Sequence, residues 1–88
     1  MALHFPNPSR SYDADGRRIR FWGHDDALEV PFFLEESALF KLYPKTTNAE
    51  PEILAAFDAA RNRILAVAGR MYTPRKRRSF YVLTPDDF

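Results

Sequence analysis

The sequence predicts an α+β fold of two layers, in which two helices pack on one face of a small, mainly antiparallel sheet. Three observations carry this prediction. Apolar and polar residues alternate over residues 10–34, the period changes to that of a helix after residue 34, and strand-forming residues return at 79–84. With 88 residues, the chain has the size of one domain, which we place at residues 1–88.

The N-terminal part is expected to form an arm and then a β-meander over residues 10–34. Residues 1–8 contain two prolines and no periodicity, so we expect an irregular arm that Phe5 ties to the domain. The tripeptide Ala14-Asp15-Gly16 is typical of a turn, because Asp-Gly supplies the positive φ that tight hairpins need.

The two main strands of the meander are predicted at residues 17–23 and 27–34. The faces of the first strand alternate, with Ile19, Phe21 and Gly23 on one and Arg18, Arg20 and Trp22 on the other. The apolar face of the second carries Leu28, Val30, Phe32 and Leu34. Because Pro31 has no N–H to donate, we expect this second strand to be bulged there or to lie at an edge of the sheet.

Two helices and a last strand follow. Residues 35–42 carry apolar residues at helical spacing and acids in the first turn, and Pro44 ends this short helix. A long helix is predicted at residues 50–72, because one apolar stripe continues over about five turns. The stripe is formed by Ile53, Phe57, Ala60, Ile64, Val67 and Met71. The last strand is predicted at residues 79–84, followed by one further helical turn.

Composition excludes several kinds of site. The absence of cysteine excludes a disulfide scaffold, a thiolate zinc site and a cysteine nucleophile. The three glycines form no phosphate-binding loop. No apolar run exceeds five residues, whereas a membrane span needs about 20, so we expect no membrane partner. The first residues do not resemble a signal peptide, and a cytoplasmic location is therefore expected.

Charge is unevenly distributed along the chain. Residues 1–58 carry six basic and ten acidic residues, whereas residues 59–85 carry seven basic residues and no acid. This asymmetry favours an anionic partner, unless the charges of the two parts intermingle on one surface. The most concentrated basic segment is the loop formed by Arg75, Lys76, Arg77 and Arg78.

Two helices on one face of the sheet leave the other face uncovered, or covered by a partner, and we expect binding there. The predicted contact residues are Arg18, Arg20, Trp22, Arg75, Lys76, Arg77 and Arg78. If the last strand lay beside residues 17–23, Phe80 or Tyr81 would join this face, as on sheets that hold single-stranded nucleic acid. The alternative is a solvated loop and a face partly buried by the arm.

A second surface is the side of the long helix away from its apolar stripe. It carries small residues that allow a second copy to approach closely, namely Ala55, Ala59, Asn62, Ala66 and Gly69. The alternative explanation is that alanine is simply a good helix former at a solvent face. Homodimer formation is therefore left open.

A third hypothesis places an enzyme or metal site at His24. Its neighbours Asp25 and Asp26 are metal-ligand types, but adjacent residues on a short turn rarely converge on one ion, so we expect no metal and no cofactor. Catalysis would need a serine and an aspartate around His24, and a chain this short has little volume for a deep pocket. We therefore expect no catalytic residue.

Several short blocks also occur together in a characteristic order. They are Phe5-Pro6, Tyr12-Asp13, Arg20-Phe21-Trp22-Gly23-His24-Asp25, Val30-Pro31-Phe32, Ala38-Leu39, Phe57-Asp58 with Arg61 and Ile64, and Leu83-Thr84 with Asp87-Phe88. Over nearly its whole length the chain resembles a family of small bacterial proteins of unknown function, DUF1488. The resemblance implies a bacterial, single-domain α+β protein, and it implies no activity, cofactor or catalytic residue.

These observations together predict a small cytoplasmic protein without catalysis, a protein-interaction module whose partner is another protein or a second copy of itself. The alternative is a nucleic-acid-binding regulator that uses the basic loop 75–78 and the exposed sheet face.

Overall fold

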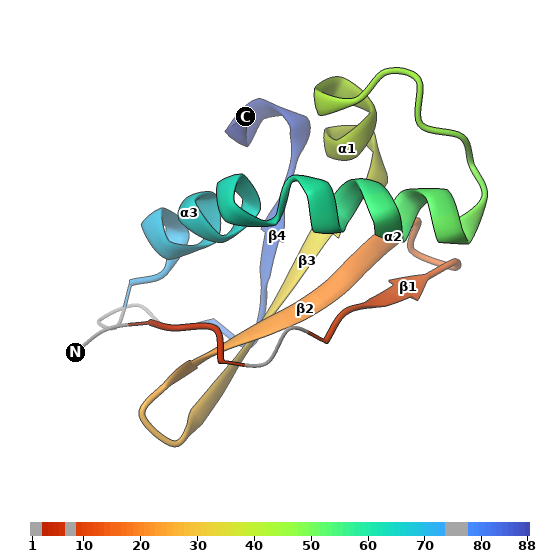
Figure 1. Cartoon of the computed structure of the whole chain (residues 1–88). Helices are drawn as coiled ribbons and strands as arrows, with labels where there is room; N and C mark the ends of the chain where they lie inside the picture. Colours follow the sequence, from red (N-terminus) through yellow and green to blue (C-terminus); the bar gives the residue numbers. More distant parts are fainter. Residues whose placement is uncertain (1–2, 7–8, 74–77) are drawn as a thin grey trace.

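Within residues 3–6, 9–73 and 78–88, which the computed structural model describes, four strands form one mixed sheet in the order β1-β2-β3-β4 (Figure 1). The strands are β1 (Ser11–Asp13), β2 (Arg18–Asp25), β3 (Leu28–Glu35) and β4 (Tyr81–Leu83). The helices are α1 (Glu36–Leu42), α2 (Glu50–Ala59), α3 (Arg61–Met71) and the 3-10 turn η2 (Pro85–Asp87). Both hairpins are antiparallel, whereas β4 pairs with β3 in parallel. The α+β prediction is confirmed.

Alternation of side chains positions the long hairpin of β2 and β3 against the helices. Ile19 and Phe21 of β2 and Phe32 and Leu34 of β3 are buried, while the residues between them lie on the other face. The hairpin loop contains only Asp26 and Ala27, because Asp25 is paired with Leu28. The first strand therefore extends to Asp25, two residues beyond its predicted end at residue 23.

The turn between β1 and β2 differs from its prediction. The residue with positive φ is Arg17, at 52°, and not Gly16. Gly16 leaves space for two side chains instead: a Cβ there would lie 2.7 Å from Nε of Arg18 and 2.8 Å from Oδ2 of Asp13, and these flexible side chains would have to shift. The glycine thus leaves room for the ion pair between Asp13 and Arg18.

The single long helix predicted at residues 50–72 is wrong, because α2 and α3 meet at a break at Ala60 (Figure 1). Ala60 has φ −98° and ψ 9°, outside the helical region. The apolar stripe nevertheless continues across the break, since Phe57, Ala60 and Ile64 are all buried. The break lets both helices keep this stripe on the sheet while the chain changes direction, and the number of helices rises from two to three.

The N-terminal arm lies along the edge of β2. His4 and His24 exchange backbone hydrogen bonds of 3.0 and 2.7 Å in an antiparallel bridge. The Phe5 ring lies 5.7 Å from that of Phe32 and 6.2 Å from that of Phe21, so it extends the core. Gly23 permits this approach, because a Cβ there would lie 2.8 Å from Cε2 of Phe5.

The last strand is shorter than predicted and lies on the opposite side of β3 from β2. The possibility that the last strand lies beside residues 17–23 is therefore wrong, because β4 pairs with β3 and not with β2. The expectation for Pro31 also needs correction, because β3 is an inner strand. The pairing of β3 with β4 starts at Phe32, one residue after Pro31. The missing N–H of Pro31 therefore lies just outside this ladder.

No helix in the described part of the chain is long and apolar enough to cross a membrane.

Candidate functional site

The helices α1, α2 and α3 cover one side of the sheet, and we call the other side the open face (Figure 1). The open face carries arginine and aromatic residues. Strand alternation assigns its residues, since every second side chain of β2 and β3 is buried on the helix side. The open face comprises Arg18, Arg20, Trp22, His24, Glu29, Pro31, Phe33, Glu35, Phe80 and Val82, together with Ser11, Asp13 and His4, which are paired with residues of this face of β2.

One row of contacts crosses the sheet from β1 to Phe80, the residue before β4. Nε of Arg18 donates to Oδ2 of Asp13 at 3.1 Å, and Cζ of Arg18 lies 3.8 Å from the centre of the Phe33 ring. Phe33 meets Phe80 edge to face at 5.6 Å. The N–H of Gly16 and the guanidinium of Arg18 both donate to Asp13 and hold the pKa of that carboxyl below its usual value. Arg18 is thus fixed in position and its charge is partly neutralised.

The predicted residues Arg20 and Trp22 lie together in the centre of the open face. Cζ of Arg20 is 5.5 Å from the centre of the Trp22 ring, a cation–π distance. Arg20 is exposed and Trp22 is half-buried. The structure therefore brings Arg18, Arg20 and Trp22 to one surface, while their role in binding stays a prediction.

Three residues of the predicted basic loop, Arg75, Lys76 and Arg77, lie outside the described residues. Arg78 is exposed, and its backbone N–H donates to the hydroxyl of Tyr81 at 3.4 Å. It lines a hollow of about 340 Å³ with the first half of β3, Ser79 and Tyr72. Arg78 thus lies toward the β4 side of β3 and is separated from Arg18 and Arg20 by that strand.

The residues around His24 point in different directions. His24 lies on the open face, whereas the carboxyl of Asp25 is buried and accepts a hydrogen bond of 2.6 Å from the hydroxyl of Tyr72. Asp26 is exposed in the hairpin loop. Among the residues that the structure describes, no group of three or more metal-ligand side chains is brought together.

A second polar cluster fixes the start of α1. Glu36 is buried and accepts hydrogen bonds from the hydroxyl of Tyr12 at 2.8 Å and from Nε of Arg17 at 2.7 Å. The bond to Glu36 raises the pKa of Tyr12, and burial adds to this effect. The hydroxyl therefore stays protonated as a donor at neutral pH. Sequence reasoning did not identify this cluster, because its members come from three separate elements.

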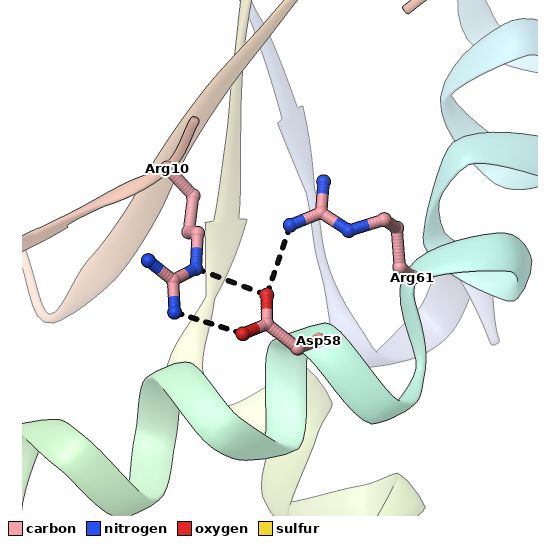
Figure 2. A network of polar contacts seen from close by, with 3 residues as sticks. All are labelled: Arg10, Asp58 and Arg61. Atoms are coloured by element: carbon pink, nitrogen blue, oxygen red, sulfur yellow. Dashed lines mark hydrogen bonds and ion pairs between the residues drawn. The ribbon is translucent and has the colours of Figure 1, made fainter. Parts of the chain in front are cut away.

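The break between α2 and α3 is braced by a third cluster, which Figure 2 shows from close by. The carboxylate of Asp58 accepts two hydrogen bonds from Arg10, at 3.0 and 2.8 Å, and one from Arg61 at 2.9 Å. Burial alone would raise the pKa of Asp58, but the bonds from the two arginines outweigh it and lower the pKa below 3.8.

This lowered pKa predicts acid sensitivity at the helix break. The carboxylate of Asp58 stabilises the fold above its ordinary pKa of 3.8, and this contribution is lost as the pH falls through the lower folded-state value. Solvent screening limits it to about 0.5–1 kcal/mol, because Asp58 is half-exposed. Urea unfolding at about pH 5 and about pH 3 should therefore show a larger drop for the natural chain than for Asp58→Asn. Equal drops in both proteins would contradict this assignment.

Comparison with known proteins identifies the family. The sequence profile described as "protein of unknown function (DUF1488)" matches residues 3–84. A crystal structure of a protein of unknown function from the DUF1488 family of Shewanella loihica PV-4 is similar, with a TM-score of 0.74 and 14% identity. The match covers 94% of this chain and 90% of that chain, and it shows a shared fold. No curated protein matches the sequence. The chain therefore belongs to the DUF1488 family.

Proposed function

We propose that this protein is a non-catalytic interaction module of the bacterial cytoplasm, which binds a partner protein through the open face. The observation that carries the proposal is the combination of Arg20, Trp22 and Phe33 on one strand-built surface. Arginine and aromatic residues are enriched in protein interfaces, and tryptophan and arginine are frequent among the residues that dominate binding energy.

The charges of the open face favour a protein over a nucleic acid. Arg18 is paired with Asp13, and the same face carries the carboxylates of Glu29 and Glu35. A phosphate backbone would meet these acids as well as the arginines, and counterion release needs a net excess of basic contacts. A protein surface can match both signs, which is how interfaces gain specificity.

The test compares the same charge reversal on the two layers of the fold. Arg20→Glu changes the open face, whereas Arg63→Glu changes an exposed residue of α3 on the helix layer. The natural chain and each variant are immobilised, and the proteins that each one captures are compared. We expect one partner protein to bind the natural chain and Arg63→Glu but not Arg20→Glu. Equal capture by both variants would contradict the proposal.

A second arm tests the nucleic-acid alternative directly. Fluorescence anisotropy of labelled single-stranded and duplex oligonucleotides is measured across a salt series. We expect no binding that depends on Arg20. Binding with a log–log salt slope of about −3, lost in Arg20→Glu, would replace the protein partner by a nucleic acid.

A further inference from the structure

We infer that the partner of the open face is a second copy of the chain, packed face to face with the first. The two copies are related by a two-fold axis that lies between the two facing sheets, parallel to the strands and above the line between β2 and β3. This inference rests on the proposed function and names its partner. Closed two-fold dimers bury the same patch of both chains, so the patch must be complementary to itself. The register of the β2–β3 hairpin shows that the open face meets this requirement.

Four cross-strand pairs of this hairpin lie on the open face. Along the hairpin they are Arg18 with Glu35, Arg20 with Phe33, Trp22 with Pro31, and His24 with Glu29. A half-turn about an axis between the two strands places each β2 residue over the β3 member of its own pair in the second copy. The four cross-strand pairs within one chain thus become four pairs between chains, each present twice.

Two of these pairs are chemically favourable between chains, because Arg18 faces a carboxylate and Trp22 faces proline. In the pair of Arg20 with Phe33, Arg20 meets a ring on which Arg18 of that chain already lies at 3.8 Å. The fourth pair sets His24 against Glu29, and no pair brings like charges together. The mean strand directions stay aligned, as they do when two sheets pack face to face about 10 Å apart.

A two-fold axis across the strands gives a poorer arrangement. Such an axis, set between the rows of Arg20 and Trp22, places Glu35 of one copy over Glu29 of the other. Like charges placed opposite each other suppress an interface. The order of charges along β3 therefore selects the axis that runs along the strands.

The state of Glu35 within one chain supports the same arrangement. Although Glu35 is opposite Arg18 in register, the Nε of Arg18 is directed to Asp13. In the described part of the chain, Glu35 forms no ion pair. Its carboxylate is thus available for a cation from a second copy.

The test uses Trp22, which is the chain's single tryptophan and lies in the proposed interface. Sedimentation equilibrium from micromolar to millimolar protein should show the mass rising toward twice 10.2 kDa. The emission of Trp22 should shift to shorter wavelength over the same range, because the indole loses contact with water. A constant monomer mass with unchanged emission would overturn the inference.

Charge reversal locates the interface. Glu35→Lys sets a lysine against Arg18 twice in each dimer, and we expect dissociation to become at least about tenfold easier. Glu52→Lys, the same change at an exposed position of α2, should leave dimerisation unchanged. Equal dimerisation of both variants would overturn the inference without requiring any other variant to fold.

A mixing experiment then tests the pairing itself. Arg18→Glu and Glu35→Lys should each dimerise poorly alone, whereas an equal mixture should form a heterodimer in which opposite charges face each other at both sites. Circular dichroism verifies that each variant is folded before mixing. If the natural chain is a monomer and still captures a partner that depends on Arg20, self-association is rejected and the proposed function stands. If neither self-association nor capture occurs, both are rejected.

Discussion

Replacing Phe32 by alanine is expected to destabilise the protein by about 3–5 kcal/mol, the range observed when large buried aromatic residues are truncated. Phe32 is fully buried at the centre of the sheet. Its ring lies 5.7 Å from Phe5, 5.4 Å from Phe21 and 5.3 Å from Tyr81. The truncation would thus loosen the arm, β2 and β4 from β3 at the same time.

The neighbouring residue provides the matched control. Phe33→Ala removes the same atoms from the same strand, but on the open face, where Phe33 is half-buried under Arg18 and beside Phe80. We expect this variant to cost no more than about 1.5 kcal/mol. Urea unfolding of both variants gives the comparison, and equal costs would contradict the assignment of the two faces.

The contrast between Phe32 and Phe33 follows directly from the sequence. In β2 and β3 the apolar residues recur at every second position, and one face of each strand must be buried, so the alternation fixes which side chains enter the core. The same pattern predicted that Arg18, Arg20 and Trp22 share a face. The stripe from Ile53 to Val67 likewise identified the buried side of the helices.

Features that depend on tertiary contacts were not predictable. Nothing in the local sequence of Ala60 disfavours a helix. Beside the break, Asp58 is hydrogen-bonded by Arg10, which lies 48 positions away in the sequence. The sequence pattern assigned the positive φ of this turn to Gly16, but the structure has it at Arg17. The space that Gly16 leaves is used by the ion pair between Asp13 and Arg18, which the local sequence does not reveal. A three-residue β4 carries no signal for the strand it pairs with.

The open face was predictable in part for the same reasons. Alternation in β3 places Phe33 and Glu35 beside the predicted arginines, but attention to the basic residues left both outside the predicted contact set. Phe80 was assigned to this face only under a strand order that is wrong, and it reaches the face from the opposite side, next to Phe33. The complementarity of the face with itself required the register of β2 and β3, which a sequence pattern alone does not give.

The buried carboxyl of Asp25 is the feature that sequence reasoning interpreted least well. Asp25 was considered as a metal ligand beside His24 and not chosen, but its burial was not predicted: it points into the helix side of the sheet and is only 7% exposed. There the hydroxyl of Tyr72, at the C-terminal end of α3, donates a hydrogen bond of 2.6 Å to it. A buried polar group is costly when its partner is removed, so this bond ties the end of α3 to the tip of the β2–β3 hairpin.

We therefore expect Tyr72→Phe, which removes only the hydroxyl, to cost about 1–3 kcal/mol. The matched control is Tyr43→Phe, where the ring is exposed and the change should cost less than about 0.5 kcal/mol. Repeating Tyr72→Phe in an Asp25→Ala background should make it nearly neutral, because the group that needed the hydroxyl is gone. A full cost in that background would show that the hydroxyl of Tyr72 stabilises the fold through a different neighbour, and the link between α3 and the hairpin would have to be reassigned.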